Sequence, residues 1–103
     1  MRVKNMTSAK TGRSVPNQFI ITITETELIN GEPIERVVKY FQSYKSVIAK
    51  KVMRCGRLFV YLDLHKWNYS TTTSKYRNQF LDETTKETKR KIKSGEYILA
   101  DLN

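Results

Sequence analysis

Alternating hydrophobic and polar positions predict a β-hairpin in the first half of the chain. Phe19, Ile21 and Ile23 recur at every second position, which is the period of a half-buried strand. Asn30–Gly31 follows, and this pair is preferred in type I′ turns because both residues tolerate positive φ. A two-residue hairpin is therefore expected here.

The turn decides which residues face each other across this hairpin. In its register Glu25 lies opposite Arg36, and opposite charges at such positions stabilise strand pairing. Four apolar side chains then share one face, namely Ile21, Ile23, Val38 and Tyr40. Thr22 and Lys39 share the opposite face.

Two further strands are expected between residues 47 and 63. Val47–Met53 and Arg57–Asp63 flank Arg54–Gly56, where the glycine can supply the backbone conformation of a turn. Apolar side chains alternate along the second of these segments. A helix over Val47–Met53 remains the alternative, since alanine, lysine and methionine all permit it.

After Trp67 the pattern becomes helical. Hydroxyl side chains over residues 70–74 are candidates for an N-cap, and Tyr76 and Phe80 lie four residues apart on one stripe. Thr84–Glu87 has the form of a capping box, which marks the start of a second helix. The signals allow either two helices or one bent helix.

The expected fold class is α+β. An antiparallel sheet of about four strands, with its hairpin at Asn30–Gly31, carries one or two C-terminal helices packed on it. The helical region covers residues 73–94, and residues 96–102 form a short closing strand. Residues 1–16 show no periodicity and are expected to be a mobile basic arm, which leaves residues 17–103 as a single domain.

The charge of the chain adds a class of partner. Nineteen Lys and Arg against ten Asp and Glu give a net charge of +9. Such a domain attracts polyanions, because phosphates release counterions when cationic side chains neutralise them. Residues 39–57 carry six cationic residues and no acidic one, so we expect a basic face rather than an evenly charged surface.

Basic residues interleaved with aromatic ones form the candidate binding site. Lysine and arginine would contact phosphates, and an exposed aromatic ring would stack on a base. The candidates are Lys39, Lys45, Lys50, Lys51, Arg54, Arg57, Phe59 and Tyr61, with Lys75 and Arg77 in support. The alternative is that the aromatic rings belong to the core and the lysines form a solvated edge that prevents unwanted sheet pairing.

The start of the helical region is a second candidate site. Backbone amides and hydroxyl groups over residues 71–77, together with Lys75 and Arg77, could bind a phosphate or a carboxylate. Ordinary helix capping explains the same residues.

The sequence does not indicate catalytic or metal chemistry. Cys55 and His65 are the only residues of their types, so one chain offers no multi-ligand His/Cys metal site. A lone cysteine also excludes an internal disulfide and fits a reducing, intracellular compartment. No unbroken apolar stretch exceeds five residues, so no membrane span is expected. We therefore expect a protein that is not an enzyme and has no cofactor.

An ordered run of short motifs resembles a family of small bacteriophage and prophage proteins. The motifs are Tyr40–Ala49 (YFQSYKSVIA), Trp67–Thr73 (WNYSTTT), Tyr76–Leu81 (YRNQFL) and Ile92–Tyr97 (IKSGEY). The resemblance spans most of residues 12–103 and implies a phage-encoded protein in the cytoplasm of a host bacterial cell. Small early phage proteins often bind and disable a host enzyme or defence complex.

Two hypotheses of function follow. The first is a non-enzymatic phage accessory protein whose basic surface binds nucleic acid or a host nucleoprotein complex. The alternative is an inhibitor that contacts a host enzyme or defence system, such as a CRISPR-Cas or restriction complex, through the Asn30–Gly31 hairpin. A third reading is a small-ligand binder at the threonine-rich start of the helical region.

Overall fold

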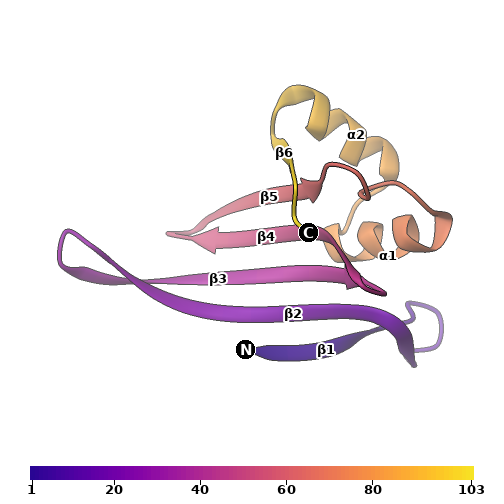
Figure 1. Ribbon diagram of the computed structural model, residues 1–103, viewed down its shortest axis with the longest axis horizontal. Helices are drawn as coiled ribbons and strands as arrows, with labels where there is room; N and C mark the ends of the chain where they lie inside the picture. The colour runs from indigo at the N-terminus through magenta and orange to yellow at the C-terminus, as the bar shows by residue number, and fades with distance from the viewer.

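The computed structural model describes residues 1–103, which form a six-stranded sheet and two helices (Figure 1). The strands are β1 (Arg2–Thr7), β2 (Ser14–Ile29), β3 (Glu32–Ser43), β4 (Ser46–Arg54), β5 (Arg57–Asp63) and β6 (Tyr97–Ala100). The helices are α1 (Thr71–Leu81) and α2 (Thr85–Ser94), and both precede β6 in the chain. The fold is α+β, as expected, but with six strands where about four were predicted.

The strands lie in the sheet in chain order, from β1 at one edge to β6 at the other. Neighbouring strands are antiparallel except for β5 and β6, which are parallel. The parallel pair follows from the connection, because the chain passes through both helices before it returns to the sheet. The sheet is therefore mixed rather than purely antiparallel.

The hairpin between β2 and β3 has the predicted register. Ile29 pairs with Glu32 and Glu25 pairs with Arg36, whose Nη2 donates a hydrogen bond to the Glu25 carboxylate at 2.6 Å. Both residues of Asn30–Gly31 have positive φ, at 52° and 81°. The tip of this hairpin extends beyond the other strands, on the left of Figure 1.

The segment after this hairpin is a strand, so the helical alternative for Val47–Met53 is wrong. β4 pairs with β3 on one side and with β5 on the other. Cys55–Gly56 forms the turn between β4 and β5, and both residues have positive φ. β-branched valines and an isoleucine favour the extended backbone in this segment. Pairing on both edges then satisfies its backbone N–H and C=O groups.

The N-terminal segment is also a strand, which corrects the expectation of a mobile arm. β1 pairs with β2, and Met6 is buried in the main core. The Asn5 side-chain amide donates to the carbonyl oxygen of Val15 at 3.0 Å. Sequence pattern missed this strand because its side chains are mostly exposed and polar, so only the pairing with β2 defines it.

The helical region consists of two helices. Ser70 caps α1 by accepting a hydrogen bond from the Thr73 amide at 3.1 Å, and Thr84 caps α2 in the same way. α1 ends at Asp82, whose φ of 54° breaks the helix without a glycine or proline. Neither helix is long and apolar enough to cross a membrane.

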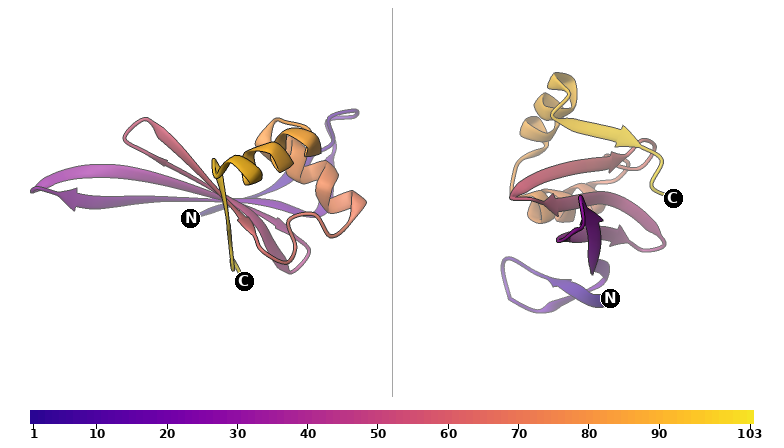
Figure 2. Two further views of the ribbon diagram at one scale, coloured as in Figure 1. Left: turned by 90° about the horizontal axis from the view of Figure 1, so that it is seen from above. Right: turned by 90° about the vertical axis from the view of Figure 1, so that its left-hand side faces the viewer.

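The core lies between the sheet and α1. The Phe41 ring on β3 contacts the Phe80 ring on α1, with a centroid distance of 5.8 Å. Nine buried residues form this cluster, namely Met6, Phe41, Ile48, Ala49, Val60, Leu62, Tyr76, Phe80 and Tyr97. Figure 2 shows both helices at one end of the sheet, away from the tip of the β2–β3 hairpin.

Candidate functional site

The sheet has one face toward α1 and one face that no helix covers. Cross-strand partners share a face, and successive residues of a strand alternate between faces. Phe41 contacts α1, so its neighbour Tyr40 belongs to the uncovered side. We call this side the open face.

Two neighbouring rows of register partners form the centre of the open face. The first row takes one residue from each strand, namely Val3, Ile21, Tyr40, Lys50, Tyr61 and Ile98. The second row consists of Ile23, Val38, Val52 and Phe59. Nine of these ten residues are apolar or aromatic, so the open face is an apolar surface with a lysine at its centre.

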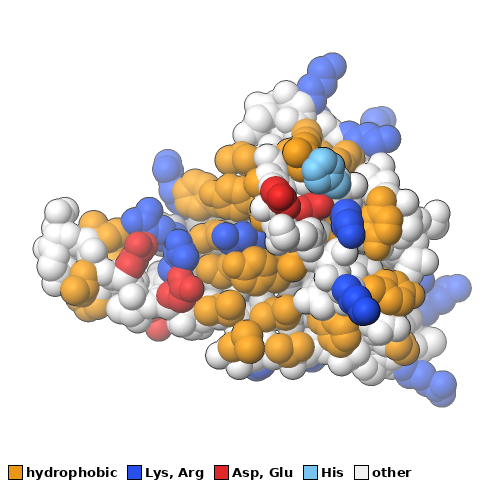
Figure 3. Space-filling view, viewed as in Figure 1, with side chains coloured by type: hydrophobic (Ala, Val, Ile, Leu, Met, Phe, Trp, Pro, Cys, Tyr) orange, Lys and Arg blue, Asp and Glu red, His pale blue; other side chains and the backbone are white.

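Part of this apolar surface is exposed to solvent. In Figure 3, hydrophobic side chains gather over the middle of the sheet, with charged side chains grouped toward the hairpin on the left. Phe59 is 40% exposed and Ile98 is 49% exposed. Val38 and Val52 are buried, yet neither belongs to the core cluster that contains α1 residues. The open face therefore has an apolar layer of its own.

Lys50 lies between two aromatic rings. Its Nζ atom is 5.6 Å from the ring centroid of Tyr40 and 5.6 Å from that of Tyr61. Cations at this distance are attracted to the ring quadrupole. Lys50 takes part in none of the ion pairs of the structure, so its charge has no acidic partner.

Charged residues border the apolar rows on the hairpin side. Arg36 pairs with Glu25, and Arg54 pairs with Glu27. Arg57 occupies the same register row as Arg36 and Arg54 but makes no ion pair. Lys50 and Arg57 are thus the two cations of the open face that no acid neutralises.

The structure separates the predicted cationic run onto different surfaces. Lys50, Arg54 and Arg57 lie on the open face, together with Phe59 and Tyr61. The separation follows from the alternation of side chains along β3 and β4.

Two further candidates, Lys39 and Lys51, are register partners on the opposite face. Lys51 donates a hydrogen bond from Nζ to the Phe80 carbonyl at 2.7 Å, so it anchors α1. Burial and the nearby charge of Lys39 lower the pKa of Lys51. Lys45 is exposed in the turn between β3 and β4.

Arg77 has a structural environment rather than the expected ligand-facing one. Its side chain is fully buried, and its Nη1 and Nη2 atoms donate to oxygens of Trp67, Asn68, Asn78 and Thr85. Burial lowers the pKa of the guanidinium, but arginine remains charged in proteins. This environment connects α1 to the loop before it and to the start of α2.

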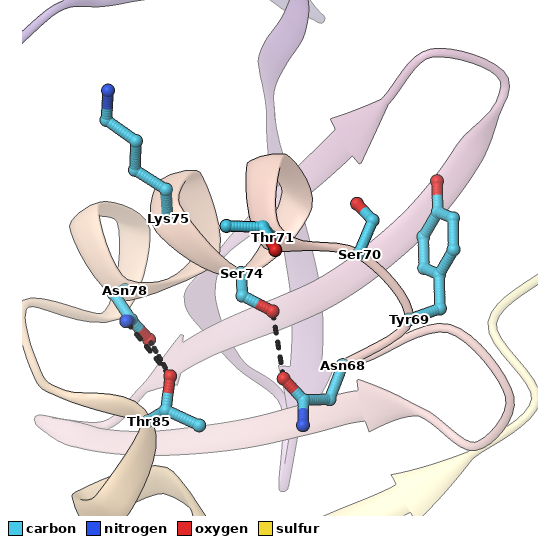
Figure 4. A pocket seen from close by; sticks show the side chains of 8 residues that line it. All are labelled: Asn68, Tyr69, Ser70, Thr71, Ser74, Lys75, Asn78 and Thr85. Carbon is cyan, nitrogen blue, oxygen red and sulfur yellow. Dashed lines mark hydrogen bonds between the residues drawn. The ribbon is translucent and has the colours of Figure 1, made fainter.

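The start of α1 borders an open polar depression of about 720 Å³ (Figure 4). Its lining side chains mostly bond to one another or to Arg77: Ser74 donates to Asn68 at 2.8 Å, and Asn78 donates to Thr85 at 3.1 Å. Lys75 extends away from the other lining side chains in Figure 4. Capping and internal hydrogen bonds account for these residues.

Tyr40 shares the open face with the predicted residues Lys50, Phe59 and Tyr61. The hairpin register placed Tyr40 on one face with Ile21, Ile23 and Val38, and that face is the one the helices leave open. No local pattern indicates which of two apolar faces a helix covers.

Comparison with known proteins places the chain in a family without assigning an activity. No curated protein and no solved structure matches it. A model described as a family of unknown function, DUF8033, matches residues 1–96. Because the match covers most of the 103 residues, the chain belongs to this family.

Proposed function

We propose that the chain is a non-enzymatic nucleic-acid-binding protein and that the open face is its contact surface. One observation carries the proposal: two cations without acidic partners, Lys50 and Arg57, lie among the aromatic rings of Tyr40, Phe59 and Tyr61. In such proteins cationic side chains bind the phosphates, and apolar or aromatic side chains stack on the bases.

The composition of the molecule supports a polyanionic partner. An exposed apolar surface of this kind marks an interaction site in a protein that does not aggregate. The net charge of +9 favours an anionic ligand over a neutral or cationic one, through long-range attraction and counterion release. A phage accessory role, which the resemblance of the motifs implies, is part of the proposal, with the nucleic acid either free or within a host nucleoprotein complex.

The test is fluorescence anisotropy with labelled DNA and RNA oligonucleotides at about 0.15 M salt, a concentration at which weak non-specific contacts are screened. The Lys50→Gln/Arg57→Gln variant should lose about tenfold or more in affinity, because two phosphate contacts are removed. Lys39→Gln/Lys89→Gln removes the same charge from exposed positions away from the open face and should bind almost as tightly as wild type. Equal losses in the two variants, or no binding by the wild-type chain, would contradict the proposal.

The projecting hairpin favours a second candidate function, the inhibition of a host enzyme or defence complex by protein contact. Its tip extends past the rest of the sheet in Figure 1, and Leu28 beside the tip is 74% exposed. An exposed leucine at the end of a projecting two-stranded ribbon is suited to insertion into a partner's cleft.

This second candidate has a separate test. Deletion of Leu28, Ile29, Glu32 and Pro33 removes two cross-strand pairs and keeps the Asn30–Gly31 turn, the alternation of faces and the ion pair between Glu27 and Arg54. The shortened protein should fail to protect phage against a host restriction or CRISPR-Cas system, while its oligonucleotide affinity stays unchanged. Full protection by the shortened protein would exclude the hairpin tip as the contact.

A further inference from the structure

We infer that the ligand of the open face is a single-stranded nucleic acid, with bases stacked on Tyr40, Tyr61 and Phe59 and a phosphate bound by Lys50. This inference rests on the proposed function and adds the class of ligand. Three features of the open face carry it: the spacing of its rings, its shape and its small number of free cations.

The three rings are spaced for neighbouring bases. Tyr40 and Tyr61 occupy strands on either side of β4, so their backbones lie about 10 Å apart, twice the spacing between adjacent strands. Phe59 is two residues from Tyr61 on the same face of β5, a separation of about 7 Å. Sheets that bind single strands present aromatic rings in this way and stack two or three bases on them.

Lys50 occupies the position that a phosphate between two stacked bases requires. Its Nζ atom lies 5.6 Å from the ring centroids of both Tyr40 and Tyr61. A backbone that connects a base on one ring to a base on the other must therefore pass this ammonium group. The charge has no acidic partner that the phosphate would have to displace.

The shape of the molecule disfavours a duplex. Base readout in a duplex requires a helix or a two-stranded ribbon that enters the major groove. Both helices lie on the other side of the sheet from the open face, since α1 packs on Phe41. The projecting ribbon carries four glutamates, Glu25, Glu27, Glu32 and Glu35, of which the last two make no ion pair and repel phosphates. A duplex thus meets either an acidic ribbon or a face without a protruding element.

The charge of the open face leads to the same class of ligand. Lys50 and Arg57 are its only cations without an ion pair, whereas duplex binding without base readout depends on many phosphate contacts. Most of its area is apolar, which suits the π-faces of unpaired bases. Base stacking rather than charge is therefore expected to supply most of the affinity.

The experiment uses the full chain and three labelled ligands of about 12 nucleotides, a length within the usual range for single-strand sites. They are an unstructured single strand, the same strand annealed to its complement, and an abasic strand that keeps the phosphates but has no bases. The single strand should bind at least about tenfold more tightly than the duplex or the abasic strand, because each stacked base contributes a factor of roughly five to a hundred.

Ring-removal variants complete the experiment. Tyr40→Leu and Phe59→Leu keep apolar side chains on the open face and should each weaken single-strand binding about tenfold. Two matched controls should have little effect: Tyr69→Leu, at an exposed tyrosine in the loop before α1, and Leu58→Ala, beside Phe59 but on the opposite face. Thermal unfolding of every variant separates loss of a contact from loss of the fold, and the abasic ligand tests stacking in the wild-type chain.

The outcomes distinguish the two proposals. Equal or tighter binding of the duplex, or of the abasic strand, overturns the single-strand inference and leaves the proposed function in place. Binding of none of the three ligands overturns the proposed function itself. If the wild-type chain binds none of the ligands and is a dimer, and Phe59→Leu makes it a monomer, then the open face is a protein interface and both proposals are wrong.

Discussion

A buried arginine without a carboxylate partner organises the region around the start of α1. Arg77 is fully buried, and neutral oxygens from Trp67, Asn68, Asn78 and Thr85 accept its hydrogen bonds. The Trp67 ring lies 5.1 Å from the guanidinium carbon. The planar guanidinium can serve several acceptors at once, which an ammonium group on a flexible stem cannot do.

Substitution of Arg77 should therefore affect stability rather than binding. We expect Arg77→Lys to lower the free energy of unfolding by about 2 kcal/mol or more, because it leaves buried acceptors without donors. Urea denaturation measures this loss. The exposed neighbour on α1 provides the control: Lys75→Ala should change the unfolding free energy by less than about 0.5 kcal/mol. A stable Arg77→Lys variant with reduced oligonucleotide affinity would return Arg77 to the binding site.

Asp63 gives the fold a dependence on acid pH. Burial disfavours the charged form of this carboxylate, but hydrogen bonds from Leu102, Asn103, His65 and Lys66 outweigh burial and hold its pKa below the ordinary 3.8. A carboxylate with a depressed folded pKa stabilises the fold above about pH 4, and this contribution is lost as the pH falls through the folded value.

The Asp63→Asn variant tests this dependence. It should be about 1–3 kcal/mol less stable than wild type near pH 7, because an amide accepts these hydrogen bonds less strongly than a carboxylate. The difference should shrink as the pH falls below about 4 and through the lowered pKa of the wild-type carboxylate. Urea denaturation across this range measures it. A difference that does not vary with pH would mean that Asp63 does not carry the acid sensitivity.

At the scale of elements, two turns of the sheet share one backbone conformation but not the same residue types. Asn30–Gly31 and Cys55–Gly56 both place two successive residues at positive φ. Asparagine adopts this conformation readily, whereas cysteine does so at a cost. The turn between β4 and β5 is therefore less stable than the turn between β2 and β3.

Cys55→Asn should repair the weaker turn. We expect the unfolding free energy to rise by about 0.5–1 kcal/mol, because the side chain is exposed and only the backbone preference changes. Thermal unfolding under reducing conditions measures the gain. Cys55→Val should move stability in the opposite direction, since β-branched side chains disfavour positive φ. If both substitutions have the same sign, the backbone of the turn is not what limits stability.

At the scale of the whole molecule, the two faces of the sheet differ in burial and in contacts. The face toward α1 contains the main core, and Lys51 on that face anchors the helix. The open face keeps the exposed Phe59 ring, the half-buried rings of Tyr40 and Tyr61, and two cations that make no ion pair. The excess positive charge of the chain is therefore spread over several surfaces, and only part of it lies on the open face.

This distribution predicts a shallow salt dependence of nucleic-acid binding. Two to four phosphate contacts, from Lys50, Arg57 and neighbouring lysines, give a slope of log affinity against log salt of roughly −1.4 to −2.8 for a single strand. If all nine excess charges contributed, the slope would be about −6. Anisotropy titrations at several salt concentrations measure the slope. A value near −6 would show that the ligand follows the charge of the chain rather than the open face.

Several elements could be predicted because their signals are local. The Asn30–Gly31 pair set the register of β2 and β3, and the Thr84–Glu87 pattern marked the start of α2. α2 ends at Gly95, whose φ is 83°. β1 was missed and β6 was not identified as parallel, because both depend on a partner strand distant in the chain. The predicted site residues also fall on two faces of the sheet, because side chains that are adjacent in a strand, such as Lys50 and Lys51, point to opposite faces.

The sequence by itself determined the α+β class, the register of the central hairpin, the helix caps and the excess of positive charge. Each of these depends on a residue's own conformational preference or charge, or on neighbours a few positions away. Only the tertiary structure decided which face of the sheet α1 covers. That choice buried Phe41 and left Tyr40 on the open face, and it turned Arg77 inward. Both faces of β3 carry apolar side chains, so packing of the whole chain, and not any local pattern, selects between them.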